Sequence, residues 1–200
     1  MTSASMTEGQ IERRSAVARL LAARDGALVV TGLGSPSYDV HAHADTDDNY
    51  YLWGAMGGAA LVGLGLAQAQ RQRRVMVITG DGEQLMAMGS LATIAVARPT
   101  NLDVIVLDNQ HYGETGMQAS HTAAGIDLAA VAAACGFADT GRLHSMDEVD
   151  ALCGRLRQKA AGPRLFVLKI HAENLPRSLP PRDAVFIKNR FRAHLGLKTC

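Results

Sequence analysis

A single carboxylate, Asp81, lies between two glycines directly after an apolar run in this sequence. The run covers residues 75–79 (VMVIT), and the letters GDG follow it. A second apolar run, at 102–107, is followed by the letters DNQH, which include the amide of Asn109. Carboxylate and amide oxygens are hard donors that Mg²⁺ or Ca²⁺ takes, and Mg²⁺ usually completes its coordination with water and phosphate oxygens. Asp81 and Asn109 are therefore candidate ligands of a divalent cation that also binds a diphosphate.

Both candidates depend on the strands that precede them. Strands that read as continuous apolar runs and alternate with helices indicate a parallel sheet covered on both faces. Ligands of such sheets bind beyond the carboxyl ends of the strands. We therefore expect the chemistry to gather after Val30, Ile78 and Leu107. The expected fold class is α/β, with a three-layer, doubly wound, mostly parallel sheet and helices on both faces.

The positions of the elements follow from hydrophobic spacing. Strands are expected within 27–34 and at 75–79, 102–109 and 164–170. Helices are expected at 11–26, in the Gly- and Ala-rich segment 52–70, and at about 85–97, 128–135 and 146–161. The residues between the first strand and segment 52–70 are expected to form a loop.

Composition limits the class of protein. The 200 residues suit one domain, and a formal charge of +1 predicts no basic surface for nucleic acid. The three cysteines have no metal-like spacing, and their odd number fits a reducing, cytoplasmic compartment better than a disulfide framework. Segment 52–70 carries no charge and is long enough to span a bilayer, but it is rich in Gly and Ala and ends in glutamines. We interpret it as a buried core helix and expect no membrane association.

The two strand-end motifs resemble the diphosphate-binding motif of thiamine-diphosphate enzymes. The usual family form is GDG…NN, and here GDG is followed by residues 83–107 and then by DNQ. Asp108 replaces the first Asn of the family pair, at a position that the family pattern does not use as a metal side chain. The resemblance implies that Asp81 and Asn109 bind Mg²⁺ through their side chains and that His111 binds it through its carbonyl.

A second segment, WGAMG at 53–57, resembles the part of these enzymes that holds the two rings of thiamine diphosphate. The resemblance implies that Gly54 offers its carbonyl to the exocyclic amine and that Met56 is the apolar wedge between the rings. A flexible, polarisable Met suits an irregular gap, although a core Met at a helix start is the alternative interpretation. The cofactor-binding residues implied by the resemblance are Gly54, Ala55, Met56, Gly80, Asp81, Gly82, Glu83, Asn109, His111, Tyr112, Gly113 and Glu114.

The four candidate catalytic side chains are one glutamate and three histidines. Glu114 follows the metal motif and is a candidate acid or base on the substrate side, or else a loop carboxylate that caps the next helix. His111 is a second candidate in the same loop. His41 and His43 belong to a His-x-His pair in the loop expected to rim the pocket, where they could transfer protons or bind a metal. Exposed histidines without a role are the alternative for this pair.

The likeness over most of the chain narrows the resemblance to the β subunit of sulfopyruvate decarboxylases and the matching half of phosphonopyruvate decarboxylases. It implies a thiamine-diphosphate- and Mg²⁺-dependent carboxy-lyase that converts a small anionic 2-oxo acid into CO₂ and an aldehyde. Lys188, Arg190 and Arg192 in the tail are candidates for binding the substrate anion, or else form a solvated basic helix face. The expected organisation is a flexible N-terminus at 1–10, a diphosphate-binding domain at 11–175, and a basic tail at 176–200 that packs on the domain or on a partner.

The resemblance also implies a partner chain. The glutamate that contacts N1′ of the cofactor comes from a pyrimidine-binding domain in this family, and a chain of this length is too short to hold both domains. A hetero-oligomer is therefore expected. Two alternatives stay open: a carboligase or acyl-transferring enzyme of the acetolactate-synthase type, and a non-catalytic nucleotide-binding module. The second has less support because neither GxGxxG nor GxxxxGK[ST] occurs.

Overall fold

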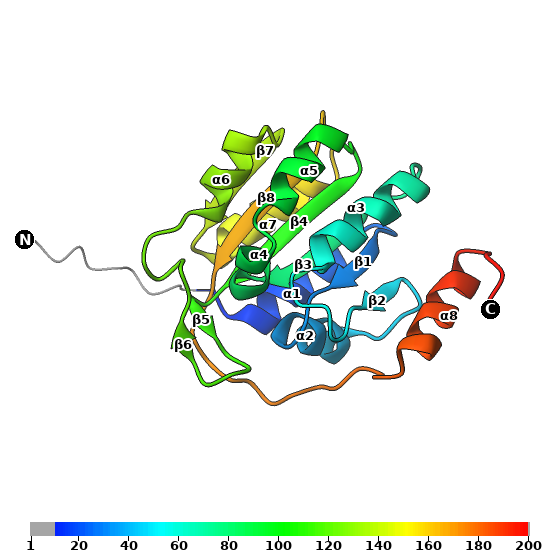
Figure 1. Cartoon of the computed structure of the whole chain (residues 1–200), viewed down its shortest axis with the longest axis horizontal. Helices are drawn as coiled ribbons and strands as arrows, with labels where there is room; N and C mark the ends of the chain where they lie inside the picture. Colours follow the sequence, from blue (N-terminus) through cyan, green and yellow to red (C-terminus); the bar gives the residue numbers. More distant parts are fainter. Residues whose placement is uncertain (1–10, 200) are drawn as a thin grey trace, which may run out of the picture.

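The structure is a computed structural model that describes residues 11–199, and its centre is a six-stranded parallel sheet (Figure 1). The predicted flexible N-terminus, 1–10, lies outside the described residues. Every neighbouring pair of strands in the sheet is parallel. The strand order is β2 (Asn49–Tyr51), β1 (Leu28–Thr31), β3 (Val75–Gly80), β4 (Leu102–Asp108), β8 (Arg164–Lys169) and β7 (Asp139–Leu143).

Helices cover both faces of this sheet (Figure 1). One face packs against α1 (Arg13–Ala22), α2 (Ser35–His43) and α7 (Met146–Leu156). The opposite face packs against α3 (Ala59–Ala69), α5 (Ser90–Ala97) and α6 (Leu128–Cys135). The expected three-layer α/β fold class is confirmed.

Alternation along the central strands explains the two layers of core. In β3, Met76 and Ile78 join the buried cluster on the α1 face, whereas Val75 and Val77 join the cluster on the α3 face. Successive side chains of a strand point to opposite faces of the sheet. A strand that is buried on both faces must therefore be apolar at every position, which is why β3 reads as a continuous apolar run.

Three predictions about elements are wrong. Residues 35–43, expected in a loop, form α2, which Pro36 can start because its ring already fixes a helical φ. The helix expected at 85–97 is interrupted, since α4 (Asp81–Met86) ends before α5 begins. The helix expected over 52–70 covers only Ala59–Ala69, because Gly54 and Gly57 adopt φ values of 69° and 92°.

The sheet edges and the short hairpin were not anticipated. Strand β7 has the sequence DTGRL and is mostly half-buried, so it lacks the continuous apolar run of the central strands. A small antiparallel hairpin joins β5 (His111–Tyr112) to β6 (Gln118–Ala119) beyond the end of β4. The helix expected at 146–161 ends at Leu156.

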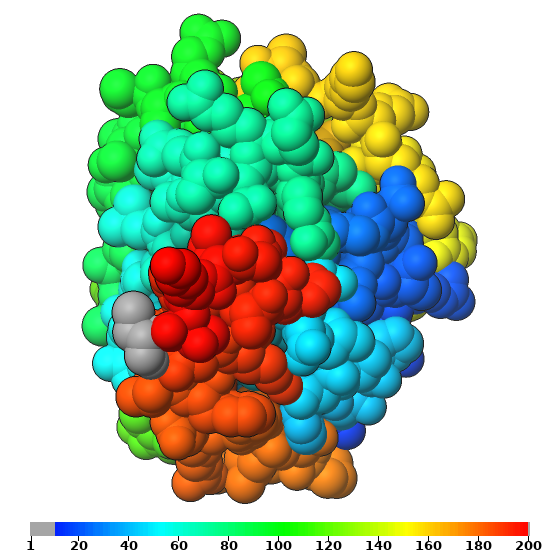
Figure 2. Space-filling view, turned by 90° about the vertical axis from the view of Figure 1, so that its right-hand side faces the viewer, coloured from blue at the N-terminus to red at the C-terminus, as the bar shows by residue number. Residues whose placement is uncertain are grey.

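The C-terminal segment crosses the molecule before it ends in α8 (Ala184–His194). Figure 2 shows this segment, in orange and red, spread over one face of the molecule, and α8 contacts β2. Trp53 Nε1–H donates to the Pro181 carbonyl at 2.8 Å, and Ile187 and Phe191 of α8 are buried. The boundary at residue 176 stays a prediction. No helix within residues 11–199 has the length and hydropathy to cross a bilayer.

Candidate functional site

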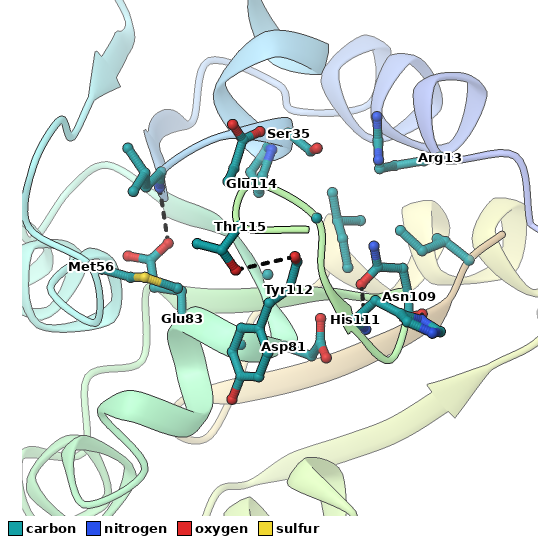
Figure 3. Close-up of a pocket in the computed structure, with 17 residues that line it drawn as sticks. Arg13, Ser35, Met56, Asp81, Glu83, Asn109, His111, Tyr112, Glu114 and Thr115 are labelled. Carbon is teal, nitrogen blue, oxygen red and sulfur yellow. Dashed lines mark hydrogen bonds between the residues drawn. The ribbon is translucent and has the colours of Figure 1, made fainter. Parts of the chain in front are cut away.

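A cavity opens where the strands β1, β3 and β4 end (Figure 3). Its walls come from the loop after β1, from the loop after β2, from the start of α4 and from the segment after β4. The polar ends expected after Val30, Ile78 and Leu107 thus meet at one place. The lining residues are Arg13, Leu33, Ser35, Pro36, Met56, Gly80, Asp81, Gly82, Glu83, Leu107, Asn109, His111, Tyr112, Gly113, Glu114, Thr115 and Ile170.

Asp81 is the first residue of α4, and the residue is 2% exposed. Ser120 Oγ donates to its Oδ2 at 2.5 Å, and Thr122 Oγ1, whose single proton is shared with Asp108, lies 3.1 Å from the same oxygen. Burial raises the pKa of Asp81 to about 6; the hydrogen bond from Ser120 opposes this shift and the nearby carboxylate of Asp108 adds to it. Both hydroxyl groups bind the same oxygen, so they leave Oδ1 to another partner.

Asp108, the departure from the family motif, lies in a network that leads to Asp81. Its side chain is buried, and Lys169 Nζ donates to Oδ2 at 2.6 Å. Thr122 Oγ1 lies 2.7 Å from Asp108 Oδ1 and 3.1 Å from Asp81 Oδ2. A buried carboxylate needs a compensating charge, which the lysine at the end of β8 supplies.

Asn109 lies at a tight turn. Its Oδ1 accepts the backbone N–H of His111 at 3.0 Å, and His111 Nδ1–H donates to the Asn109 carbonyl at 2.8 Å. Gln110 between them has a φ of 64°. β3 and β4 are adjacent in the sheet, and therefore Asp81 and Asn109 line the same cavity.

Gly82 gives room to an aromatic ring. A Cβ at this position would lie 2.6 Å from Cε1 of Tyr112, a distance that real Cβ atoms do not adopt. Tyr112, the second residue of β5, thereby packs on the start of α4. The Tyr112 ring therefore fills part of the space beside Gly82, a residue that the resemblance assigns to cofactor binding.

The WGAMG segment brings one side chain to the cavity. Met56 lines it and is 41% exposed (Figure 3). Met56 is therefore not the core Met of the alternative interpretation. Gly54 and Ala55 are not among the lining residues, and their contacts with a cofactor stay predictions.

Glu83 also lines the cavity, but its carboxylate is bound to backbone. Oε2 accepts the N–H of Leu33 at 3.0 Å, as Figure 3 shows, and Oε1 accepts the N–H of Gly57 at 3.2 Å. Burial raises the pKa of Glu83, and hydrogen bonds to the carboxylate oppose the shift. The side chain thus links α4 to the loops after β1 and β2.

Glu114 lies at the mouth of the cavity rather than at a helix cap. Its Oε2 accepts from Arg177 at 3.2 Å, and Arg177 also lies over the ring of Tyr38 at 5.7 Å. Burial raises the pKa of Tyr38, and the charge of Glu114 raises it further. The C-terminal segment therefore brings a cation to the edge of the cavity.

The histidine pair lies elsewhere. His41 and His43 belong to the last turn of α2, and neither lines the cavity. His41 Nδ1 lies 2.8 Å from Ser178 Oγ. The expectation of a pocket-rimming loop is wrong because the segment is helical, with Ser37 and Asp39 buried and hydrogen-bonded on its inner side.

The tail cations proposed for the substrate anion also lie away from the cavity. Arg190 binds Asp45 at 2.8 Å, and Arg192 donates to the Lys198 carbonyl. Neither these arginines nor Lys188 lines the cavity. Arg13, which the sequence reasoning did not single out, does line it and pairs with the buried Asp39. Arg13 is 160 residues from the carbonyl that it contacts, that of Glu173, so no local motif could reveal it.

The donors present fit a divalent cation. Asp81 offers a carboxylate and Asn109 an amide oxygen, both hard ligands, and both line one cavity. No group of three or more His, Cys, Asp or Glu side chains that could hold a metal occurs in residues 11–199. The expected Mg²⁺ ligands include only one side chain of these types, the Asp81 carboxylate. The other two are the Asn109 amide oxygen and the His111 carbonyl, so this absence does not bear on the expected site.

The chain is similar in sequence to known proteins. Residues 32–168 match the family described as "Thiamine pyrophosphate enzyme, C-terminal TPP binding domain". The chain is 42% identical to a phosphonopyruvate decarboxylase of Streptomyces viridochromogenes, over 90% of this chain and 45% of that protein. It is 42% identical to the sulfopyruvate decarboxylase subunit beta of Methanothermobacter thermautotrophicus, over 64% of this chain and 68% of that subunit.

A solved structure shows the same fold. Benzoylformate decarboxylase from Polynucleobacter necessarius has a TM-score of 0.70 at 20% identity, over 88% of this chain and 36% of that chain. The chain spans about half the length of the phosphonopyruvate decarboxylase that it matches. The family match covers more than half of the chain, and the chain therefore belongs to the thiamine pyrophosphate enzymes, of which it contains the C-terminal TPP binding domain.

Proposed function

We propose that this chain is the thiamine-diphosphate- and Mg²⁺-binding subunit of a two-chain, cytoplasmic 2-oxo acid decarboxylase. The observation that carries the proposal is the meeting of Asp81 and Asn109 at one cavity, at the ends of adjacent strands. The relatives named phosphonopyruvate decarboxylase and sulfopyruvate decarboxylase subunit beta support this reaction class. The substrate class is a small 2-oxo acid with a second anionic group.

Asp81 and Asn109 would hold Mg²⁺ through their side chains, with the His111 carbonyl as a third protein ligand. Mg²⁺ usually takes its remaining ligands from water and phosphate, which matches a diphosphate in the same cavity. Ser120 and Thr122 fix the orientation of the Asp81 carboxylate through hydrogen bonds to Oδ2. Outer partners of this kind set the geometry of metal ligands.

When bound, thiamine diphosphate supplies the electron sink that decarboxylation of a 2-oxo acid needs. Met56 would pack against the rings of the cofactor from the cavity wall. Glu114 is positioned at the cavity mouth to hold or move a proton on the substrate side. Arg177 partly neutralises Glu114 through their ion pair, which lowers the electrostatic cost of bringing an anion to this edge.

The site needs a second chain in this proposal. The chain spans 45% of the length of a phosphonopyruvate decarboxylase. The relatives named subunit beta support an arrangement in which a partner contributes the rest of the site. The partner would supply the glutamate for N1′ of the cofactor, and the assembly would be a hetero-oligomer.

The test is product analysis with the chain and the partner that co-purifies with it. The assembly is incubated with Mg²⁺, thiamine diphosphate and a 2-oxo acid that carries a sulfonate or phosphonate, with and without an acceptor aldehyde. We expect equal amounts of CO₂ and the free aldehyde in both incubations. A carboligation product that forms whenever the acceptor is present would instead favour the acetolactate-synthase type of reaction.

A further inference from the structure

The carboxylate of Glu83 is held by two loops that are far apart in the sequence. The side chain is 3% exposed. Its two oxygens accept from different donors, the N–H of Leu33 at 3.0 Å and the N–H of Gly57 at 3.2 Å. One loop follows β1 and the other follows β2, while Glu83 itself lies in α4 after β3. One side chain therefore links the ends of three strands.

The backbone at Gly32 leaves room for the Glu83 carboxylate because it carries no side chain. A Cβ at Gly32 would lie 1.8 Å from Glu83 Oε2 and 2.8 Å from its carboxyl carbon. No side chain fits at position 32 unless the carboxylate moves. A buried carboxylate requires hydrogen-bond donors. The free space at Gly32 and the two N–H groups together form a binding site that is specific for the Glu83 carboxylate.

The two loops that are hydrogen-bonded to Glu83 both contribute residues to the wall of the cavity. Leu33 lines it directly, and Met56 lines it next to Gly57, which donates to Glu83. We propose that Glu83 is a positioning residue that fixes the loops after β1 and β2 relative to the Asp81 helix, and thereby places Met56 for the bound cofactor. This inference rests on the proposed function, but its structural part can be tested without cofactor.

Trp53 reports on the second loop. It is the single tryptophan of the chain, and it lies four positions before Gly57. Its fluorescence and its quenching by acrylamide therefore measure the state of the 53–57 loop in the full chain without cofactor. In Glu83→Gln, an amide N–H₂ replaces one acceptor oxygen and faces an N–H donor, so one of the two loops loses its hydrogen bond.

The matched control is Glu148→Gln. Glu148 also accepts two backbone N–H groups, those of His144 and Ser145, but it does so at the start of α7 and does not line the cavity. Both variants remove one carboxylate that binds two N–H groups. We expect acrylamide quenching of Trp53 to rise in Glu83→Gln and to match the unsubstituted chain in Glu148→Gln. The affinity for thiamine diphosphate with Mg²⁺ should fall about tenfold in Glu83→Gln only.

Gly32→Ala gives an independent second variant. Its methyl group would displace the Glu83 carboxylate, so it should raise Trp53 quenching in the same direction. In the double variant with Glu83→Ala, Gly32→Ala should add little further change, because the two substitutions break the same contact. Fully additive effects on Trp53 quenching would contradict a shared contact.

Two results would overturn the proposal. One is a folded Glu83→Gln chain whose Trp53 quenching and cofactor affinity equal those of the unsubstituted chain. The other is a loss of unfolding free energy equal to that of Glu148→Gln with no change at Trp53, which would make Glu83 a structural residue only. An assembly of the chain with its co-purifying partner that binds no thiamine diphosphate would refute the proposed function instead, while the Trp53 comparison would still decide the role of Glu83.

Discussion

Asp81 combines burial with a fixed orientation, and both bear on what it can bind. The hydroxyl groups of Ser120 and Thr122 hold Oδ2, while burial and the neighbouring Asp108 raise the pKa of the carboxyl group. In the absence of a cation, the charged carboxylate is therefore a source of instability. A divalent cation at Oδ1 would remove that cost and gain a preoriented ligand.

The variant Asp81→Asn separates these two effects. We expect at least about a 100-fold loss in Mg²⁺-dependent affinity for thiamine diphosphate, since a charged ligand of the metal is removed. The free energy of unfolding of the cofactor-free chain should stay equal or rise, because the amide removes a buried charge. Calorimetric binding titration and urea unfolding measure the two quantities. Asp139→Asn, at an exposed ion pair with Arg155, is the control and should retain full affinity.

The pair of Asp108 and Lys169 allows a second test at the residue scale. Lys169→Met leaves the Asp108 carboxylate buried without its cation, and we expect the unfolding free energy to fall by about 3 kcal/mol. Adding Asp108→Asn removes the unpaired charge and restores the amide of the usual family motif. The double variant should therefore recover most of the lost stability in urea unfolding. A double variant that is less stable than Lys169→Met would contradict this account of the substitution.

At the scale of elements, β1, β3, β4 and β8 were predictable because each is buried on both faces and reads as an apolar run. The edge strands were not. β7 is polar and mostly half-buried, and β2 has three residues, so neither contains a periodic pattern. Helix α2 was missed because its inner side carries Ser37 and Asp39, whose partners Thr31 and Arg13 come from other elements.

The residues of the site also divide into those that a sequence pattern marks and those that only tertiary packing brings to the cavity. Asp81 and Asn109 were predictable because they follow strand patterns directly, and the resemblance to a family motif supplied their role. Arg13 lines the cavity from α1, and Arg177 of the C-terminal segment pairs with Glu114 at its mouth. Their contribution depends on tertiary packing, which no local spacing encodes.

Docking of α8 depends on charged residues of the loop before β2, and it should respond to acid. Burial would raise the pKa of Asp48, but hydrogen bonds from Arg73 and His194 outweigh burial and lower it. A carboxyl group with a lowered folded-state pKa stabilises the fold above its ordinary pKa of 3.8 and loses that contribution as pH falls through the folded value. Asp48→Asn should therefore cost about 1 kcal/mol at neutral pH.

The difference between Asp48→Asn and the unsubstituted chain should disappear in strong acid, where both side chains are neutral. Urea unfolding at the two pH values measures it. Asp150→Asn, at a pair with Arg19 in which both side chains are about half exposed, is the control with little effect at either pH. A constant difference across this range would show that the ionised carboxylate is not what Asp48 contributes.

At the scale of the whole molecule, the chain presents apolar side chains near the cavity. Three methionines are exposed: Met56 in the loop after β2, Met86 at the end of α4 and Met88 just after it. Exposed apolar surface of this kind is typical of association sites. It agrees with the proposal that a partner completes the site.

The partner requirement gives a prediction for the isolated chain. With Mg²⁺, thiamine diphosphate and the 2-oxo acid, the purified chain alone should release CO₂ at a rate near that of the blank. Addition of the co-purifying chain should restore turnover, since it would supply the glutamate for N1′. Robust turnover by the single chain would show that the site is complete without a partner.

The central claim, that Asp81 and Asn109 hold the diphosphate end of thiamine diphosphate through a divalent cation, is tested most directly by calorimetric titration of the full chain. Thiamine diphosphate is added in the presence of Mg²⁺ and, in a parallel titration, in the presence of EDTA. The account predicts saturable binding of one cofactor per chain with Mg²⁺ and a loss of that binding with EDTA. Equal binding in both titrations, or tighter binding of a dinucleotide than of thiamine diphosphate, would contradict it.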